Sequence, residues 1–215
     1  MYFLFNWFVK ITGWIPYHLV LRPKIYYENK AVQSRKIKGK AIVVSNHTDL
    51  LDFAVVLFTF PLRTMRCAVA ELMYKKNVFM TAFLRLLGTV EVDRNSHDFG
   101  FLSACERILS RGGVVEIFPE SRLPDPGEEL PLEFKPSAVY LALQTDTPIV
   151  PICNNAKYFK KERMRVVIGE PIDVRALYDD ALSEKENIAN ITAHVRGKII
   201  EFSQRLEEEA KKEGR

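Results

Sequence analysis

Residues 41–52 read AIVVSNHTDLLD. The run Ile42-Val43-Val44 is β-branched and follows a small apolar residue, a pattern typical of a buried strand. A histidine, a threonine and two carboxylates come directly after it, and Asp52 stands five positions beyond His47. A buried strand that ends in this way indicates either a polar turn or a functional site, and the rest of the chain decides between them.

From Ala41 onward, short β-rich runs alternate with stretches of helical periodicity. The expected strands are Ala41–Val44, Met65–Ala70, Thr89–Val92, Val114–Phe118, Ile149–Ile152 and Met164–Ile168. The expected helices between them are Leu50–Phe58, Lys76–Leu87, Asp98–Ser110 and Pro136–Gln144. Gly88 and Gly112 stand where helix C-caps are expected. This alternation predicts a single α/β domain with a largely parallel sheet flanked by helices.

The first 24 residues are apolar and aromatic, but Lys10, Gly13 and Pro16 interrupt them. No uncharged run reaches the roughly 20 residues that cross a bilayer, and the basic start and cleavage site of a signal peptide are missing. Residues 1–40 hold eight Lys or Arg and one acid, a net charge of +7, against −3 for the other 175 residues. These features favour one or two short amphipathic helices in the membrane interface. A core helix and a true membrane span are the alternatives.

The C-terminal region predicts one long helix from Ser183 to about Lys212. Ser183 and Glu186 have the spacing of a capping box, and apolar residues recur with helical period from Ile188 to Leu206. No Gly/Ser-rich linker or internal repeat divides the chain. We therefore expect an interfacial membrane-binding segment at residues 1–34 and one domain at residues 35–215.

The composition argues against several classes of protein. With 47% hydrophobic and 27% charged residues, the 215-residue chain is globular. Its three cysteines are scattered without a CxxC pair, which argues against a zinc site or a disulfide framework and favours a reducing compartment. The chain has no GxGxxG, P-loop or HExxH motif. We expect no metal, no cofactor and no nucleic-acid partner.

Polar side chains follow three of the expected strands. In open parallel sheets, ligands bind beyond the carboxyl ends of the strands. The residues at these ends are Asn46, His47 and Asp52 after the first strand, Asp93 and Arg94 after the third, and Glu120 and Arg122 after the fourth. A histidine, its carboxylate and two arginines are therefore expected at one edge of the sheet.

These residue types suit acid–base chemistry on a phosphorylated substrate. A histidine accepts a proton near neutral pH, and Asp52 would fix its tautomer and stabilise the imidazolium. Because no nucleophile of the protein accompanies the pair, the attacking hydroxyl would belong to the substrate. Arg94 and Arg122 offer planar forks that match phosphate. Taken singly, a His–Asp pair is more often structural, and an arginine is more often part of a surface ion pair.

The order of these motifs resembles that of the glycerolipid acyltransferases, typified by the lysophosphatidic acid acyltransferases, over residues 35 to 172. NHTDLLD resembles the family's first motif, Asn-His, four residues, then Asp, and GTVEVDR resembles the second. FPESR resembles the third motif, Phe-Pro-Glu-Gly-Thr-Arg, but is one residue shorter, with Ser121 in place of glycine. PIVPI resembles the fourth motif, with Pro151 as its recurrent proline, and EFKPSA resembles a Phe-Lys-x-Gly-x-Ala region, with Ser137 in place of glycine.

The resemblance implies an O-acyltransferase that moves a fatty acyl group from acyl-CoA or acyl carrier protein to a lysophospholipid hydroxyl. The implied acceptor is 1-acyl-sn-glycerol-3-phosphate, which gives phosphatidic acid. Catalysis falls on His47 and Asp52; the implied substrate-binding residues are Asn46, Arg94, Glu120, Ser121, Arg122, Lys135 and Pro151. The thioester is a co-substrate, and no cofactor is implied.

The expected location is the cytoplasmic face of a membrane, with the protein peripheral or monotopic and membrane lipids as partners. Three alternatives stay open. They are a non-catalytic lipid-binding module of the same fold, an acyltransferase for another hydroxyl, and a hydrolase that uses the His–Asp pair to activate water. The sequence leaves the oligomeric state open.

Overall fold

The computed structural model describes residues 2–93, 99–159 and 162–214. The helices in these ranges are α1 (Tyr2–Leu21), α2 (Asp52–Thr59), α3 (Glu71–Tyr74), α4 (Val78–Leu87), α5 (Phe99–Leu109), α6 (Ser137–Thr145) and α7 (Glu184–Lys212). The strands are β1 (Lys24–Tyr27), β2 (Ala41–Ser45), β3 (Arg66–Ala70), β4 (Val90–Val92), β5 (Val114–Ile117), β6 (Ile149–Asn154) and β7 (Arg165–Ile168).

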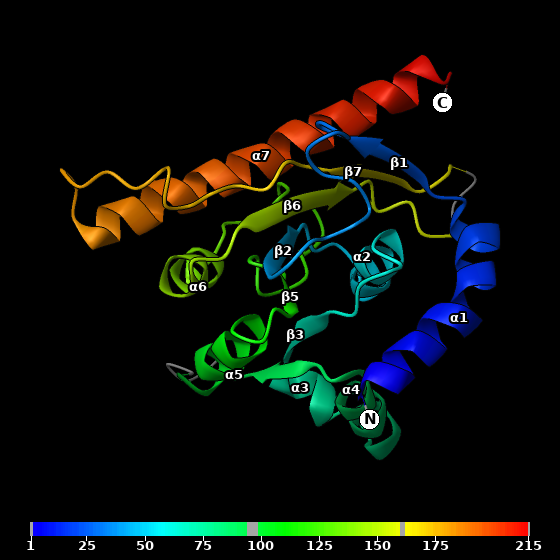
Figure 1. Ribbon diagram of the computed structural model, residues 1–215. Helices are drawn as coiled ribbons and strands as arrows, with labels where there is room; N and C mark the ends of the chain where they lie inside the picture. Colours follow the sequence, from blue (N-terminus) through cyan, green and yellow to red (C-terminus); the bar gives the residue numbers. More distant parts are fainter. Residues whose placement is uncertain (1, 94–98, 160–161, 215) are drawn as a thin grey trace.

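The strands of the described residues form one seven-stranded sheet in the order β1-β7-β6-β2-β5-β3-β4 (Figure 1). Five of its six neighbouring pairs are parallel, and the β6–β7 pair is antiparallel. The predicted α/β class and largely parallel sheet are confirmed. The reason is visible in the sequence, because a helix that can cross back over the sheet follows each of the strands β2, β3, β4 and β5.

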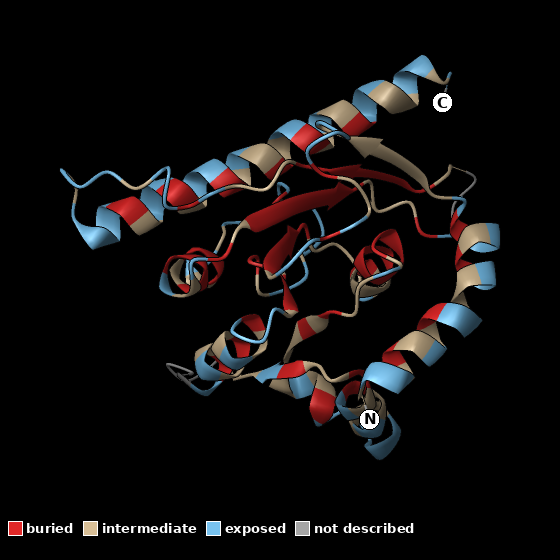
Figure 2. Cartoon of the chain, viewed as in Figure 1, coloured by how far each residue is buried: buried red, intermediate tan, exposed pale blue. Residues whose placement is uncertain are grey.

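Helices cover both faces of this sheet, and the central strands are buried between them (Figure 2). On one face, Val43, Val114 and Val150 pack with α1 and α2. On the other, the alternate strand residues pack with α5, α6 and α7. All five residues of β2 are buried, so the segment that carries His47 leaves a strand that is held in the core along its whole length.

Predicted caps and termini match the structure at the long helices. Gly88 ends α4 in the left-handed conformation with φ 74°, and the predicted capping box of Ser183 and Glu186 opens α7. Two elements were not predicted: the four-residue helix α3 and the strand β1. Because β1 pairs with β7, the sheet begins at Lys24, inside the segment 1–34 that was expected to lie apart from the domain.

The N-terminal segment forms one continuous helix, α1, with Pro16 inside it. Its buried side combines the polar residues Asn6 and Lys10 with Tyr17 and Leu21. The exposed side carries apolar residues at helical spacing: Leu4, Phe8, Ile11, Ile15 and Leu19. Among the described residues, no helix is long and apolar enough to cross a membrane.

Lys10 attaches α1 to the C-terminal end of α2. Its ammonium donates to the carbonyl oxygens of Phe60 at 2.7 Å and Pro61 at 3.4 Å, and also to that of Arg63. Carbonyls at a helix C-terminus have no partner within the helix and carry partial negative charge. The lysine that interrupts the apolar run of the sequence therefore helps to fix α1 to the domain, together with the stacking of Tyr17 on Phe58.

Replacing Lys10 with methionine should lower the free energy of unfolding by about 1–3 kcal/mol, because the substitution removes a buried donor that these carbonyl groups share. Urea unfolding followed by circular dichroism measures the change. Lys38→Met, at an exposed lysine, is the control and should stay within about 0.5 kcal/mol of the original chain. Equal stability of the two variants would contradict the anchoring role of Lys10.

Candidate active site

The loop after β2 is fixed to the end of β6 by the side chain of Asn46. Its Oδ1 accepts a hydrogen bond from the backbone N–H of Asn154 at 2.9 Å, and its Nδ2 donates to the Asn154 carbonyl at 3.0 Å. The last backbone pair between the two strands is Ser45 with Ile152. Asn46 therefore continues the strand pairing with its side chain, and this sets the position at which the chain presents His47.

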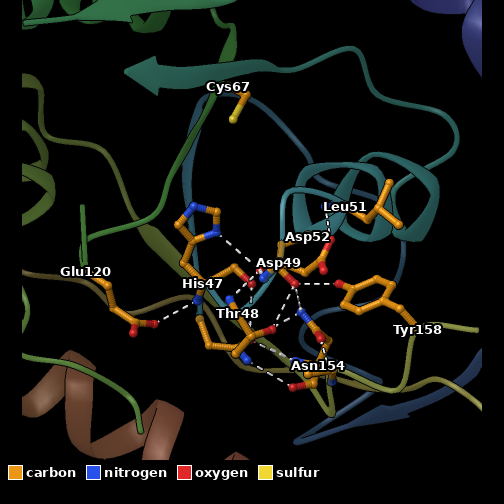
Figure 3. Close-up of polar contacts among 12 residues, drawn as sticks. His47, Thr48, Asp49, Leu51, Asp52, Cys67, Glu120, Asn154 and Tyr158 are labelled. Carbon is orange, nitrogen blue, oxygen red and sulfur yellow. Dashed lines mark hydrogen bonds and ion pairs between the residues drawn. The ribbon is translucent and has the colours of Figure 1, made fainter. Parts of the chain in front are cut away.

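The carboxylate of Asp52 is the centre of the polar network that follows (Figure 3). It belongs to the first residue of α2 and is fully buried. Its Oδ2 accepts from the backbone N–H groups of Thr48 at 2.6 Å and Asp49 at 2.8 Å, and lies 3.2 Å from Nδ1 of His47. Its Oδ1 accepts from Asn154 Nδ2 at 3.0 Å, from the Tyr158 hydroxyl and, at 3.4 Å, from Thr48 Oγ1.

Burial alone would raise the pKa of Asp52. The hydrogen bonds from His47, from Tyr158 and from the two backbone amides outweigh burial, and they hold the pKa below its usual value. The N-terminus of α2 acts in the same direction, since it carries partial positive charge. Asp52 is therefore a buried carboxylate that remains ionised at neutral pH.

His47 is held on three sides. Nδ1 faces Asp52, the ring stacks on Phe118 with centroids 4.4 Å apart at 24°, and the backbone N–H donates to Glu120 Oε1 at 2.7 Å. Because the carboxylate of Asp52 can only accept, Nδ1 carries the proton and Nε2 is left as a proton acceptor. The side chain of His47 is 16% exposed, so a small reactive group can reach it.

Glu120 joins this loop to the segment before α6. Its second oxygen, Oε2, accepts from the backbone N–H of Leu132 at 2.9 Å. Burial raises the pKa of Glu120, and the amide donors of Leu132 and His47 oppose that rise. Both carboxylate oxygens are therefore engaged with backbone groups, and Glu120 holds the histidine loop in place.

Ser121 and Arg122 follow in a turn. Ser121 has φ 62°, in the left-handed region that glycine occupies at no steric cost, which matches the glycine of the motif it resembles. The guanidinium of Arg122 makes two 2.6 Å hydrogen bonds to the carboxylate of Glu128 and lies 3.6 Å from Asp125. The planar fork expected to bind phosphate is thus paired with a carboxylate of its own loop.

Two further predicted site residues, Lys135 and Pro151, lie apart from the network. Lys135 is exposed, and its backbone N–H donates to Pro119. Pro151 is buried within β6, opposite Val44 of β2. Arg94 lies outside the described residues. The structure therefore brings together Asn46, His47, Asp52 and Glu120.

Two residues of the network were not predicted. Asn154 ends β6, so the rule that sites form at strand ends could have found it. Tyr158 lies 106 positions from Asp52, and no local pattern marks it. Next to the network, a cavity of about 580 Å³ lies between the loop residues Asn46, Thr48 and Glu120 and the C-terminal half of α7, within the usual size range of ligand sites.

Ser121→Gly should be more stable than Ser121→Ala by about 1 kcal/mol, because glycine has no Cβ to oppose the left-handed backbone. Both substitutions remove the 3.3 Å hydrogen bond from Ser121 Oγ to the Pro119 carbonyl, so their difference isolates the backbone conformation. Urea unfolding of the two variants measures it. An alanine variant as stable as the glycine variant would show that the turn is not strained.

Comparison with known proteins gives the same assignment as the motifs. A family model described as Acyltransferase matches residues 24–155, beginning at the first residue of β1. The chain is 29% identical over 183 residues to human 1-acyl-sn-glycerol-3-phosphate acyltransferase beta, covering 79% of this chain and 64% of that protein. It is 27% identical over 169 residues to the 1-acyl-sn-glycerol-3-phosphate acyltransferase of Bacillus subtilis (strain 168), covering 76% and 80%.

The bovine alpha enzyme of the same name is 28% identical over 149 residues, covering 65% of this chain and 51% of that protein. The chain thus spans between half and two thirds of the length of these mammalian relatives. Among solved structures, the 1-acyl-sn-glycerophosphate (LPA) acyltransferase PlsC from Thermotoga maritima has a TM-score of 0.69 at 20% identity, covering 94% of this chain and 79% of that one. That likeness establishes the shared fold. The family match over more than half of the residues establishes that this chain belongs to the acyltransferase family.

Proposed function

We propose that this protein transfers a fatty acyl group from a thioester, acyl-CoA or acyl carrier protein, to the free hydroxyl of 1-acyl-sn-glycerol-3-phosphate, giving phosphatidic acid. The observation that carries the proposal is the pairing of His47 with a buried, ionised Asp52. The names of the relatives supply the acceptor, because the proteins described above are 1-acylglycerol-3-phosphate acyltransferases. Both candidate donors offer the same reacting group, a thioester.

In the proposed reaction, His47 Nε2 takes the proton of the acceptor hydroxyl as its oxygen attacks the thioester carbonyl. A C–O bond forms, the C–S bond breaks, and the leaving thiolate receives the proton from the imidazolium. Asp52 stabilises that imidazolium through Nδ1, as in serine hydrolases. Asn46 and Glu120 act through the backbone by fixing the loop that carries the histidine.

Arg94 remains the proposed partner of the acceptor phosphate, with Arg122 as a second. For Arg122 to bind phosphate, the phosphate would have to replace the Glu128 carboxylate, which offers the fork a similar pair of oxygens. The remaining proposed substrate contacts are Ser121, Lys135 and Pro151.

Removing the base should abolish most of the transfer. We expect His47→Ala to lower kcat by about 10²–10⁴-fold, the usual contribution of one general base. His194→Ala, at an exposed histidine of α7, should leave kcat unchanged. The assay uses labelled acyl-CoA and acyl carrier protein donors with dispersed lysophosphatidate. A wild-type chain that transfers no acyl group to any lysolipid would favour a lipid-binding module, and a folded, fully active His47→Ala variant would exclude His47 as the base.

Tyr158 should influence how readily the His47–Asp52 pair takes up a proton. Tyr158→Phe removes a donor to the Asp52 carboxylate, so the His–Asp pair should take up its first proton more readily. The acid limb of the kcat/KM profile should then move to higher pH. Tyr17→Phe is the matched control, because the Tyr17 hydroxyl is also buried but has no hydrogen-bond partner among the described residues. Identical profiles for the two variants would remove the role of Tyr158.

We also propose that the protein attaches peripherally to the cytoplasmic face of a membrane through α1. The apolar side of α1 faces outward, since Leu4, Ile11 and Leu19 are 73%, 69% and 72% exposed. Several cations of the basic segment have partners within the protein, including Lys24 with Glu213 and Arg35 with the Thr59 carbonyl. This leaves fewer charges free to attract anionic lipid than the sequence suggested.

Vesicle co-sedimentation should therefore show binding to neutral lipid that anionic lipid strengthens and that high salt releases only in part. Each exposed lysine near an anionic surface contributes about 1 kcal/mol, and salt screens that contribution but leaves apolar insertion intact. The measurement compares neutral and anionic vesicles at low and high salt. Complete release by salt would mean that α1 does not insert.

A further inference from the structure

The turn between α3 and α4 exposes large apolar side chains that none of the described residues covers. We call residues 72–79 the α3–α4 tip. Phe79 and Val78 are 88% and 81% exposed, and Leu72 is 61% exposed. In a soluble protein, such side chains mark a surface that meets a partner when they lie together with other exposed apolar groups. The α3–α4 tip lies near α1, whose outer side also exposes apolar residues.

Helix α4 connects α1 to the α3–α4 tip. The ring of Phe5 in α1 packs edge-on against Phe83 of α4, with centroids 5.8 Å apart. Near the same end of α1, Tyr2 lies against Gly88, where an added Cβ would come within 2.9 Å of the tyrosine side chain. Figure 1 shows α3 and α4 beside the N-terminal end of α1. These contacts join α1 to the middle and to the C-terminal end of α4. Phe79 stands four positions before Phe83 and therefore on the same side of α4, so the α3–α4 tip begins one helical turn beyond the contact with Phe5.

The conformation of the α3–α4 tip is fixed by the fold. Asn77 caps α4, with its side-chain oxygen accepting from the backbone N–H of Met80 at 2.7 Å. The hydroxyl of Tyr74 lies 2.5 Å from Oγ1 of Thr89 and ties the end of α3 to the residue before β4. Val78 and Phe79 are thereby held in the first turn of α4 and directed into solvent.

The charges of the α3–α4 tip suit a lipid surface. Lys75 and Lys76 are exposed directly before Asn77 and the two apolar residues. The ammonium of Lys75 lies 2.8 Å from the carboxylate of Glu71, so residues 71–79 together carry a net charge of +1. Basic side chains beside exposed aromatic and aliphatic ones are the composition of a segment that inserts among anionic headgroups. A surface that serves a protein partner instead has fewer lysines at its centre.

We infer that the α3–α4 tip is a second membrane contact, with Val78 and Phe79 entering the acyl boundary of an anionic bilayer beside α1. The inference rests on the proposed membrane attachment of α1 and deepens it. A single interfacial helix leaves the domain free to rotate about the helix axis. A second contact away from that axis removes this freedom and fixes which edge of the sheet faces the lipid.

The test uses a fluorophore placed on the α3–α4 tip. The three native cysteines are buried, so Phe79→Cys can be labelled selectively with a polarity-sensitive dye. Leu177→Cys, at an exposed leucine in the loop before α7, is the matched control. With vesicles that contain anionic lipid, we expect the emission at position 79 to shift to the blue and to be quenched by brominated lipid, and we expect neither change at position 177. The double variant Val78→Ser/Phe79→Ser should bind these vesicles at least tenfold more weakly than Leu177→Ser.

The outcomes separate the proposals. If the full chain sediments with vesicles while the dye at position 79 remains in water, the tip inference is wrong and the attachment through α1 stands. If the chain does not bind vesicles, both membrane proposals fail, and acyl transfer to dispersed lysophosphatidate decides the proposed activity independently. If the dye is shielded without lipid and light scattering gives twice the chain mass, the tip is a contact between two copies and the inference is overturned.

Discussion

The buried charge of Asp52 is the constraint on which the arrangement of the site depends. An ionised carboxylate in the interior is stable only where donors replace the water it has lost. Asp52 obtains six of them, from the loop after β2, from the end of β6 and from Tyr158. This requirement explains three features of the site: the conformation of the loop after β2, the orientation of His47, and the contact between the ends of β2 and β6.

A second buried acid on the same face of the sheet shows what happens without such donors. Glu116 of β5 is fully buried, and its Oε1 has no hydrogen-bond partner among the described residues. Burial and the negative charge of Asp52 raise the pKa of Glu116 well above its usual value, and the charge of Lys10 and a hydrogen bond with Cys67 oppose that rise only in part. The pKa values of the two acids shift in opposite directions because six donors surround Asp52 and far fewer face Glu116.

Local patterns predicted the part of this structure that local forces decide. The β-branched runs gave the sheet class, and the polar residues at strand ends gave Asn46, His47, Asp52 and Glu120. The features that could not be predicted from the sequence depend on packing between segments that are distant along the chain. Tyr158 reaches Asp52 only because β7 and the loop before it return beside β6. Strand β1 is short and lies in a basic segment, where no local pattern predicted a strand. The orientation of α1 could not be predicted from the sequence either. The pattern shows that the helix is apolar, but only the carbonyl groups at the end of α2 explain why Lys10 turns inward.

Helix α2 connects the proposed membrane surface to the proposed chemistry. Asp52 forms its first turn, while Lys10 and Arg35 hold the carbonyl groups at its other end. Eight residues of α-helix measure about 12 Å. If α1 lies in the membrane interface as proposed, this helix is a rigid spacer between the lipid and His47. The depth of an acceptor hydroxyl in the leaflet would then decide, alongside its chemical structure, whether it comes within reach of the base.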